Sequence, residues 1–374
     1  MTISQLPQIH VRGHSERPLA RRLRVLHVVV SAGSGVVAVI EDHIANTPEF
    51  DHHALVALDE SCPIGAGLDR LATSVTTLPR TTWSRVPAIR AAVEHLNPDV
   101  IHAHSSFAGA FVRLALPRRR QRQIVFTPHG FAFERTDVPA AVRALYRLAE
   151  SILSFRGRHI AACSPREAEI ARRLPGRQTV AYVPNVVRSY RPSARTSRSA
   201  SESLLVATVG RVTAAKSPEF FAAAARTSRA RGLGIDWLWV GGTGGDPRGE
   251  DELRRSGVRV TGWVPRAVAR AHLERADVYV HCARWEGAPL TVLEAALADI
   301  PVVARRVPAL EALRVAPLYD TVDELLDILR QYPNGEAFAI ARASNAGLRD
   351  RHTNERQHAA LRPVYERAAR VPAS

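Results

Sequence analysis

The amino-acid sequence predicts an α/β protein made of two doubly wound, Rossmann-like domains that face each other across a cleft. Short β-branched runs alternate with helical patterns through both halves of the 374-residue chain, and a Ser- and Arg-rich stretch separates the halves. Strands that alternate with helices predict a parallel sheet covered on both faces. The length exceeds what one ordinary core needs and suits two domains.

The first half starts with a basic, unstructured arm, predicted over residues 1–22, and continues as an N-terminal domain over residues 23–187. Helical patterns lie between its predicted strands, for example over residues 138–154. The predicted strands are 24–30, 53–58, 99–104, 123–129, 159–164 and 179–184.

The second half follows a predicted linker at residues 188–203, which has no apolar period. A C-terminal domain is predicted over residues 204–352. A helix within residues 353–374 is long enough to cross back to the N-terminal domain. Ligands of doubly wound sheets bind beyond the carboxyl ends of the strands, so we expect the site in the cleft. The predicted strands are 204–210, 235–242, 258–263, 277–282 and 301–305.

Charge and cysteine content limit the partners and the compartment. The formal net charge of +15 predicts an anionic ligand or surface, although a preference for GC-rich arginine codons would also contribute. Three widely spaced cysteines, Cys62, Cys163 and Cys282, predict a reduced, cytoplasmic protein. A glycine turn interrupts the apolar run at residues 25–40, which favours a first strand over a signal peptide.

Lys216 is the only lysine in the chain, and it lies in "TVGRVTAAKSP", where a strand runs into a loop and a helix. Ser217 suits the N-cap and Pro218 the first helical position. Arg211 and Lys216 therefore lie beside a helix N-terminus, which disfavours cations by about 0.3–1 kcal/mol unless an anion lies between them. Taken alone, the segment is equally consistent with solvated surface charges.

A second motif, "RWEGAPLTVLEAAL", occupies residues 284–297. Pro289 predicts a helix start, so Glu286 lies in the preceding loop and Glu294 a little over one turn inside the helix. Gly287 lets the backbone approach a ligand closely. Carboxylates on both sides of a helix N-terminus suit a nucleotide sugar, whose phosphates lie between two sets of hydroxyls. The alternative is an ordinary helix capped by Glu286.

The two motifs, in this order, resemble the C-terminal half of a family-4 retaining glycosyltransferase (glycosyl transferase group 1) with the GT-B fold. The first half agrees through "PDVIHAHS", "TPHGF", "IAACSPREAEIARRL" and "VAYVPNVV", which stand in the family's order. The resemblance extends over residues 23–370. It implies that the N-terminal domain lies on the acceptor side and that the C-terminal domain binds the nucleotide sugar.

The resemblance also implies a set of site residues. Arg211 and Lys216 would grip the donor diphosphate, and Glu286 would lie near the donor sugar. His129 would face the reaction centre from the N-terminal domain. The other implied donor-binding residues are Glu294 at the ribose, Gly33 and Gly35 in the first glycine turn, Gly262 and Trp263 at the nucleobase, and Gly287, Ala288, Pro289 and Leu290 at the helix start.

Two segments depart from the family pattern. The glycine turn continues as "SAGSGVVAVIEDH" instead of a Gly-Gly-Ala-Glu-like start, and "RRVPALEAL" replaces a glycine pair after "PVVA". The second departure leaves Glu311 as the nearest match to an acid beside the donor. Sugar recognition is therefore less firmly implied than diphosphate binding.

We expect transfer of a hexose-type sugar from a nucleoside diphosphate, UDP being expected, to an acceptor hydroxyl. The two cations and the helix N-terminus would stabilise the leaving phosphate, so neither a metal nor a cofactor is expected. Family resemblance implies retention of anomeric configuration and closure of the domains over the donor. It also implies a saccharide or lipid-linked acceptor in cell-wall, capsular or exopolysaccharide assembly, and no nucleic acid partner.

Three other functions remain open at this stage. A nucleotide-sugar epimerase of the same fold would use the donor without an acceptor. A non-catalytic protein would bind polyanions or membranes through its basic surface. A degenerate relative would have lost activity. The arginines of "PRRRQRQ" (residues 117–123), with Arg143, Arg147 and Arg156, are either a solvated surface or a docking site for anionic lipid at the inner face of the plasma membrane.

Two further patterns were weighed as ligand sites. His102 and His104 stand in one predicted strand, and we expect their side chains on opposite faces, which argues against a shared metal. "GGTGGDPRGED", at residues 241–251, lacks the spacing of a dinucleotide-binding loop and is expected to form a turn near the nucleotide.

Overall fold

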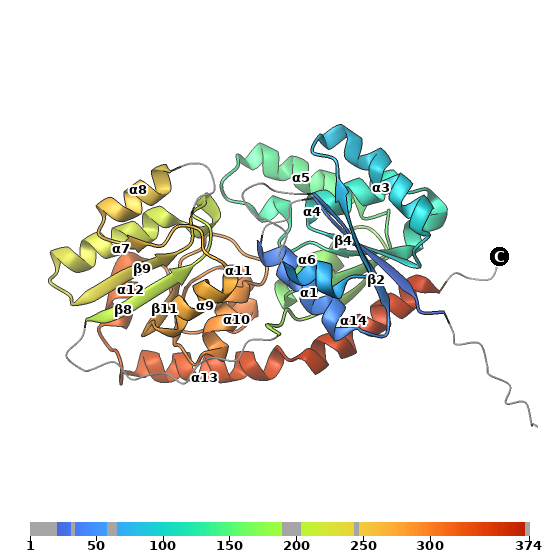
Figure 1. Ribbon diagram of the computed structural model, residues 1–374. Helices are drawn as coiled ribbons and strands as arrows, with labels where there is room; N and C mark the ends of the chain where they lie inside the picture. The colour runs from blue at the N-terminus through green and yellow to red at the C-terminus, as the bar shows by residue number, and fades with distance from the viewer. Residues whose placement is uncertain (1–20, 31–33, 58–65, 189–202, 243–246, 371–374) are drawn as a thin grey trace, which may run out of the picture.

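A computed structural model describes residues 21–30, 34–57, 66–188, 203–242 and 247–370. The predicted arm and linker lie almost wholly outside these residues, as do Gly33 and Cys62. The described chain forms two α/β domains side by side (Figure 1).

The first domain is built on a seven-stranded sheet in the order β3-β2-β1-β4-β5-β6-β7, and every pairing is parallel. One face packs on α3, α4 and α6, and the other on α1, α2 and α14. The strands are β1 (Arg24–Val29), β2 (Asp51–Ala57), β3 (Ser74–Leu78), β4 (Val100–His104), β5 (Ile124–Thr127), β6 (His159–Ala162) and β7 (Thr179–Tyr182). The helices are α1 (Ser34–Asn46), α2 (Ala66–Leu71), α3 (Thr82–Leu96), α4 (Ser106–Ala115), α5 (Ala140–Leu153) and α6 (Pro165–Arg172), with short 3₁₀ turns η1 (Arg118–Gln123) and η2 (Ala132–Glu134).

The second domain has a six-stranded sheet in the order β10-β9-β8-β11-β12-β13, again with parallel pairing throughout. Helices cover both of its faces, as all-parallel sheets require. The strands are β8 (Leu204–Val209), β9 (Ile235–Val240), β10 (Arg259–Val260), β11 (Val278–His281), β12 (Val302–Arg305) and β13 (Leu318–Tyr319). The helices are η3 (Ala214–Lys216), α7 (Pro218–Ala230), α8 (Arg248–Arg255), α9 (Arg266–Glu274), α10 (Leu290–Leu297), α11 (Pro308–Ala312), α12 (Val322–Leu329) and α13 (Glu336–Arg351). The last helix, α14 (Asn354–Ala369), belongs to the first domain.

The predicted fold class is confirmed, and the strand predictions fail at the sheet edges. β3 and β13 were not predicted: β3 is largely exposed and carries the weakly apolar sequence SVTTL, and β13 has two residues. The strand expected at residues 258–263 is reduced to two residues, because Gly257 (φ 78°) and Gly262 (φ 70°) turn the backbone on either side.

The C-terminal helices run along one side of the molecule from the second domain to the first (Figure 1). α13 packs on α10 and β12, while α14 packs on β4 to β7 and α1. Leu361, Val364 and Tyr365 of α14 are buried in the first domain. Where the two helices meet, His352 Nδ1 lies 2.7 Å from the Asn185 carbonyl oxygen, which ties the crossover to the end of the first domain.

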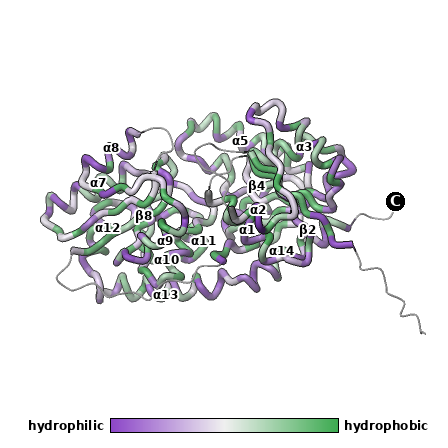
Figure 2. The backbone as a smooth tube through the Cα atoms, in the orientation of Figure 1, coloured by the Kyte–Doolittle hydropathy of each residue, from purple (hydrophilic) through white to green (hydrophobic). Residues whose placement is uncertain are grey.

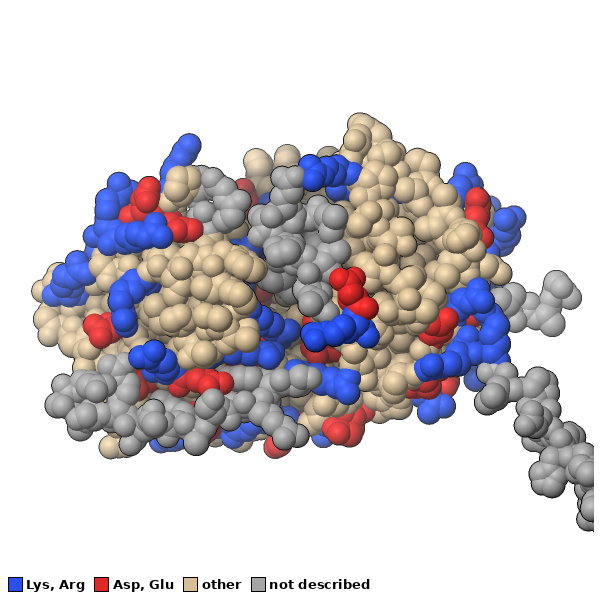
Figure 3. Space-filling model, viewed as in Figure 1, with Lys and Arg blue, Asp and Glu red and all other residues tan. Residues whose placement is uncertain are grey.

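Hydrophobic and charged residues are arranged to support both cores. Hydrophobic segments gather in the strands and inner helix faces (Figure 2). Lys and Arg side chains are spread over both domains, with acidic side chains among them, on the face shown in Figure 3. Arg113 of α4 and Glu150 on α5 form a buried ion pair, in which the guanidinium binds both carboxylate oxygens, at 2.7 and 3.0 Å. This pair holds α5 against the helical layer that contains α4. Removing one partner would leave a buried charge without its counter-ion.

Candidate functional site

The candidate site lies where the carboxyl ends of the two sheets face each other, and it consists of two adjoining cavities. Their volumes are about 290 Å³ and about 180 Å³. Both are lined by Gly35 at the start of α1, by Arg211 after β8, and by Leu290 at the start of α10. The site therefore lies in the expected cleft, beyond the carboxyl ends of the strands.

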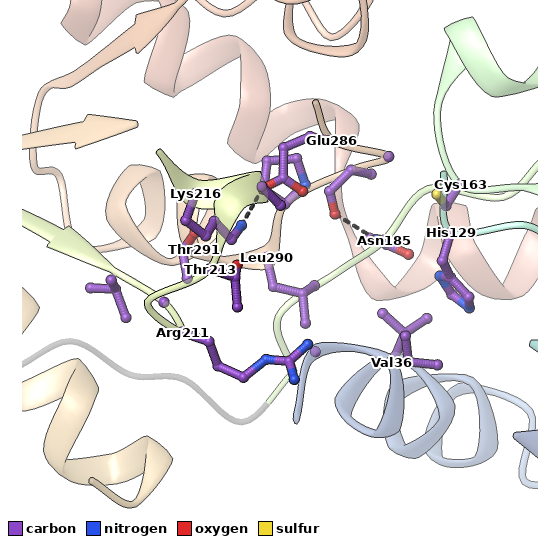
Figure 4. Close-up of a pocket in the computed structure, with 18 residues that line it drawn as sticks. Val36, His129, Cys163, Asn185, Arg211, Thr213, Lys216, Glu286, Leu290 and Thr291 are labelled. Atoms are coloured by element: carbon purple, nitrogen blue, oxygen red, sulfur yellow. Dashed lines mark hydrogen bonds and ion pairs between the residues drawn. The ribbon is translucent and has the colours of Figure 1, made fainter. Parts of the chain in front are cut away.

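All four predicted catalytic residues line the first cavity. Figure 4 shows Arg211, Lys216 and Glu286 on the side of the second domain, with His129 and Val36 on the other side. The described residues that line it also include Gly287, Ala288, Pro289 and Leu290, all four predicted to bind the donor. The structure thus brings the two sequence motifs together with the N-terminal histidine.

An ion pair joins the two motifs. The Lys216 ammonium contacts the Glu286 carboxylate, with only 24% and 15% of the two side chains exposed (Figure 4). Burial acts to raise the pKa of Glu286, but the Lys216 charge and the neighbouring His281 together outweigh it, and the pKa falls to about 2. Glu286 is therefore an anion at every physiological pH. Its charge partly neutralises Lys216 before any ligand binds.

The local backbone fixes Lys216 in this position. η3 ends at Lys216, and α7 begins two residues later with Ser217 at the N-cap and Pro218 at the first helical position, as predicted. Ser217 adopts a left-handed conformation (φ 54°), and its hydroxyl donates to Glu219 Oε1 (2.6 Å) instead of capping the helix. Gly210 leaves room for the lysine stem, because a Cβ there would lie 3.3 Å from Lys216 Cε.

Arg211 differs from Lys216 in its surroundings. It is exposed, lies at the border of the two cavities, and makes no ion pair among the described residues. Figure 4 shows its guanidinium reaching toward α1 of the first domain. Of the two predicted phosphate-binding cations, Arg211 is thus the one whose charge is unneutralised.

The second cavity has mainly apolar walls and one carboxylate. Val240, Val264 and Trp263 line it, and Trp263 is 51% exposed. Glu294, on α10, is buried, and its Oε1 accepts hydrogen bonds from Arg266 Nε (3.0 Å) and Arg270 Nε (2.9 Å). The carboxylate lies at the cavity wall, where it can accept hydrogen bonds from hydroxyl groups.

Gly287 brings the two domains into backbone contact. A Cβ at this position would lie 2.7 Å from both the Gly130 nitrogen and the His129 carbonyl carbon, so only glycine fits. Next to it, Asn185 Nδ2 donates to the Ala288 carbonyl oxygen (2.9 Å). The close approach that Gly287 permits in this structure is therefore that of the protein's own backbone.

His129 is held at this contact by Glu167. The His129 backbone is left-handed (φ 53°), and the next residue, Gly130, has φ 93°. Glu167 Oε1 accepts from the Gly130 amide and Oε2 from the Cys163 amide, each at 2.7 Å. Burial raises the pKa of Glu167 to about 7 and lowers the pKa of His129 to about 4. His129 is thus a neutral imidazole at the cavity wall.

The expectation for His102 and His104 is wrong. Their rings lie on the same face of the sheet with centroids 4.0 Å apart, because residues two apart in a strand share a face. Ligand nitrogens of His27, His102 and His104 all lie within 4.8 Å of one another, a spacing that would suit a metal. Each of these rings, however, already uses both nitrogens in hydrogen bonds, so a metal would have to displace them.

The remaining predicted residues have varied positions. Trp263 lines the second cavity, and the preceding Gly262 forms a bridge with Gly241 beside it. Gly35 faces open space, with nothing within 4 Å of a Cβ placed on it. Glu311 pairs with Arg306 (3.3 Å) and lines neither cavity. Of the glycine-rich turn, Gly241 and Gly242 line the second cavity, while residues 243–246 lie outside the described residues.

Several residues of the site escaped the sequence analysis. Arg266 and Arg270 stand one helical turn apart in "PRAVARAH", and this spacing after the Gly-Trp loop was the available signal. Glu167 and Asn185 lie inside quoted family segments but carry no chemistry that the sequence alone distinguishes. Their roles depend on contacts between segments far apart in the chain.

Comparison with known proteins identifies the family. Residues 34–189 match the family model described as Glycosyltransferase Family 4, and residues 203–331 match the one described as Glycosyl transferases group 1. The chain belongs to the group 1 and family 4 glycosyltransferases. The predicted family is thereby confirmed.

Two curated proteins are distant relatives of this glycosyltransferase. An uncharacterized 41.2 kDa protein in the cps region of Klebsiella pneumoniae is 24% identical over 302 residues, which is 77% of this chain and 82% of the relative. The Escherichia coli UDP-Gal:alpha-D-GlcNAc-diphosphoundecaprenol alpha-1,3-galactosyltransferase is 25% identical over 232 residues, 56% of this chain and 58% of that enzyme.

Solved structures share the fold of the glycosyltransferase. Sucrose-phosphate synthase from Thermosynechococcus elongatus has a TM-score of 0.72 at 17% identity, covering 92% of this chain and 98% of that one. Anabaena Alr3699/HepE in complex with UDP and glucose has a TM-score of 0.69 at 15% identity, covering 93% and 98%. Within the described residues, no helix combines the length and apolarity that a membrane crossing needs.

The ion pair yields a prediction about the pKa of Glu286. In Lys216→Met the burial of the carboxylate remains while the neighbouring cation is lost, so the pKa should rise from about 2. In the wild type this depressed pKa adds stability above pH 4.5, and that stability is lost as the pH falls toward 2. Carbon-detected NMR titration of glutamate carboxyls checks this, and a Glu286 pKa unchanged in the variant would contradict it.

Proposed function

We propose that the enzyme transfers a hexose-type sugar from UDP to an acceptor hydroxyl, with the donor spanning both cavities. The observation that carries the proposal is the pairing of an apolar cavity that holds one carboxylate with a cavity lined by Lys216, Glu286 and His129, and with Arg211 at their border. A nucleotide sugar has the same sequence of parts: a base and ribose, a diphosphate, and a hexose.

The nucleoside end fits the second cavity. Trp263 and the valine side chains offer apolar contact to a base, and Glu294 can accept hydrogen bonds from the ribose hydroxyls. The assignment of uracil is supported by relatives: Alr3699/HepE was solved with UDP and glucose, and the name of the E. coli relative gives UDP-Gal as its donor.

The diphosphate fits between Arg211, Lys216 and the N-terminus of α10. The first amides of a helix have no intrahelical partner and favour an anion. Lys216 uses one of its three protons for Glu286 and retains two for phosphate oxygens. Positive charge at this place stabilises the phosphate as it leaves, which lowers the barrier without a metal.

The hexose fits the first cavity, between Glu286 and His129. Both residues line this cavity, one from each domain. We extend the proposal to retention of the anomeric configuration, which the family implies, and to an acceptor that enters from the side of the first domain. NMR of the product's anomeric proton distinguishes retention from inversion.

The two cations give the function its sharpest test. In an assay of UDP release in EDTA with an added saccharide acceptor, Arg211→Ala should lower kcat/KM by about 100-fold or more, since a group opposing the leaving charge is lost. Lys216→Arg should also lower kcat. The planar guanidinium cannot occupy the site beside Gly210 and at the same time donate a hydrogen bond to Glu286. The matched control is Arg342→Lys, an exposed arginine on α13 that lines neither cavity. Wild-type turnover by Arg211→Ala and Lys216→Arg would refute the assignment.

We further propose that the enzyme docks on an anionic membrane surface through α5. Leu145, Leu148, Ile152 and Phe155 follow a helical spacing and are 57–69% exposed. On neighbouring α4, Phe107 and Leu114 are also exposed. Exposed arginines occur in the same part of the chain, at Arg147 in α5 and at Arg118 and Arg119 in η1. Apolar side chains between basic ones suit the interface of an anionic bilayer, and the name of the E. coli relative gives a diphosphoundecaprenol-linked acceptor.

Vesicle co-sedimentation tests the docking surface. The wild type should sediment with vesicles that contain anionic phospholipid, and sediment less with neutral vesicles or high salt. Leu148→Ser combined with Ile152→Ser should weaken binding by about tenfold or more, since each change removes apolar area from the interface. Ile340→Ser, on exposed α13 of the second domain, is the control and should bind as the wild type does. Equal binding by both variants would contradict the proposal.

A further inference from the structure

Four histidines form a continuous hydrogen-bonded chain across the first sheet. His52 Nδ1 lies 3.0 Å from His27 Nε2, and His27 Nδ1 lies 3.0 Å from His104 Nε2. His104 Nδ1 lies 3.1 Å from Nε2 of His129. The chain joins the interior of the domain to a residue that lines the first cavity.

The parallel register creates this diagonal path. His52 pairs with Val25, so the step from His52 on β2 to His27 on β1 advances two residues along the strands. His27 pairs with His102, so the step from His27 to His104 on β4 also advances two residues. His104 pairs with Thr127, and the next step advances two residues again to His129. Each step keeps the side chain on one face and moves it toward the carboxyl ends, where the cleft lies.

The inner end of the chain sets its direction. His52 Nε2 lies 2.9 Å from the carbonyl oxygen of Thr47, which can only accept a hydrogen bond. The Thr47 hydroxyl, 3.1 Å from the same nitrogen, donates its proton to the His43 carbonyl (2.7 Å). His52 Nε2 must therefore carry a proton and donate.

A neutral imidazole carries one N–H proton, so it donates at one ring nitrogen and accepts at the other. The direction of the hydrogen bond at His52 therefore fixes the direction of every later bond in the chain. Burial lowers the pKa of His27 and His104 well below the ordinary 6.5, and that of His52 and His129 to about 4. With its proton on Nε2, His52 accepts from His27 at Nδ1. His27 then accepts from His104, and His104 accepts from His129.

We propose that His52, His27 and His104 are positioning residues that hold His129 as the tautomer with its proton on Nε2 and a lone pair on Nδ1. Nδ1 makes no hydrogen bond with the described residues, so it is the nitrogen left for a ligand. It accepts a hydrogen bond from a hydroxyl of the sugar in the first cavity, a consequence that rests on the proposed function.

His102 supplies an internal control. It lies on the same face and is fully buried, but its nitrogens contact the Tyr365 hydroxyl and Thr127 Oγ1, each at 2.8 Å, and it takes no part in the chain. Removing His102 or His52 therefore deletes a comparable buried ring, and only the loss of His52 breaks the path to His129.

Long-range ¹H–¹⁵N correlation of histidine-labelled full-length protein, recorded without donor, reads the tautomer directly. The His129 signals, assigned by their loss in His129→Gln, should show a protonated Nε2 and a bare Nδ1. A proton on Nδ1 of His129 in the wild type would overturn the proposal. Because no sugar is present, this outcome is independent of whether the proposed transfer reaction is correct.

The variants test whether the chain causes the tautomer. In His52→Phe, His27 loses its acceptor, so His129 should become a mixture of tautomers and kcat for transfer should fall by about threefold to tenfold. In His102→Phe the His129 signals should keep the wild-type pattern. A His129 tautomer unchanged in folded His52→Phe would overturn the proposal. If this variant does not fold, the wild-type spectrum alone tests the proposal.

Discussion

The contact between Gly287 and the His129–Gly130 backbone is the constraint on which the site depends. It places the carboxyl ends of two independent sheets against each other, with no side chain between the two backbones. The Asn185 bond to the Ala288 carbonyl and the crossover of α13 and α14 keep the domains in this relation. Without this approach, His129 would not share a cavity with Lys216 and Glu286. The candidate site is thus a property of the domain arrangement more than of either domain.

Several charged side chains in the cleft are neutralised by ion pairs within the protein. Lys216, the only lysine in the chain, is paired with a buried glutamate, and Glu294 is paired with two arginines. In each pair, donor or acceptor positions remain unused and face a cavity. Arg211 alone among the predicted phosphate ligands keeps its charge uncompensated within the described residues. A compact ammonium suits the place beside Gly210 because it bonds Glu286 and still has protons for phosphate.

The fold and the loop residues of the site could be predicted from the sequence because the patterns that identify them are local. Alternating strand and helix patterns predict parallel sheets, and Pro218 and Pro289 mark helix starts within a residue. Prediction failed where the determinant is non-local. β3 and β13 lie at sheet edges with little apolar signal, and Glu167 acts through contacts that only the fold creates. The prediction for His102 and His104 was wrong for a local reason, because residues two apart in a strand share a face. The path through His27 and His52 could not be predicted, because it needs the register of neighbouring strands.

We propose that this cleft binds a nucleoside diphosphate through the second cavity and the cations beside it. Thermal unfolding of the full chain with UDP, GDP and ADP tests this binding most directly. A ligand that binds only the folded protein stabilises it by about 2.7 kcal/mol at 100 times its Kd. We expect a saturable rise in the unfolding temperature with UDP, larger than with GDP or ADP, and largely lost in Arg211→Ala. An unfolding temperature unmoved by all three nucleotides would contradict it.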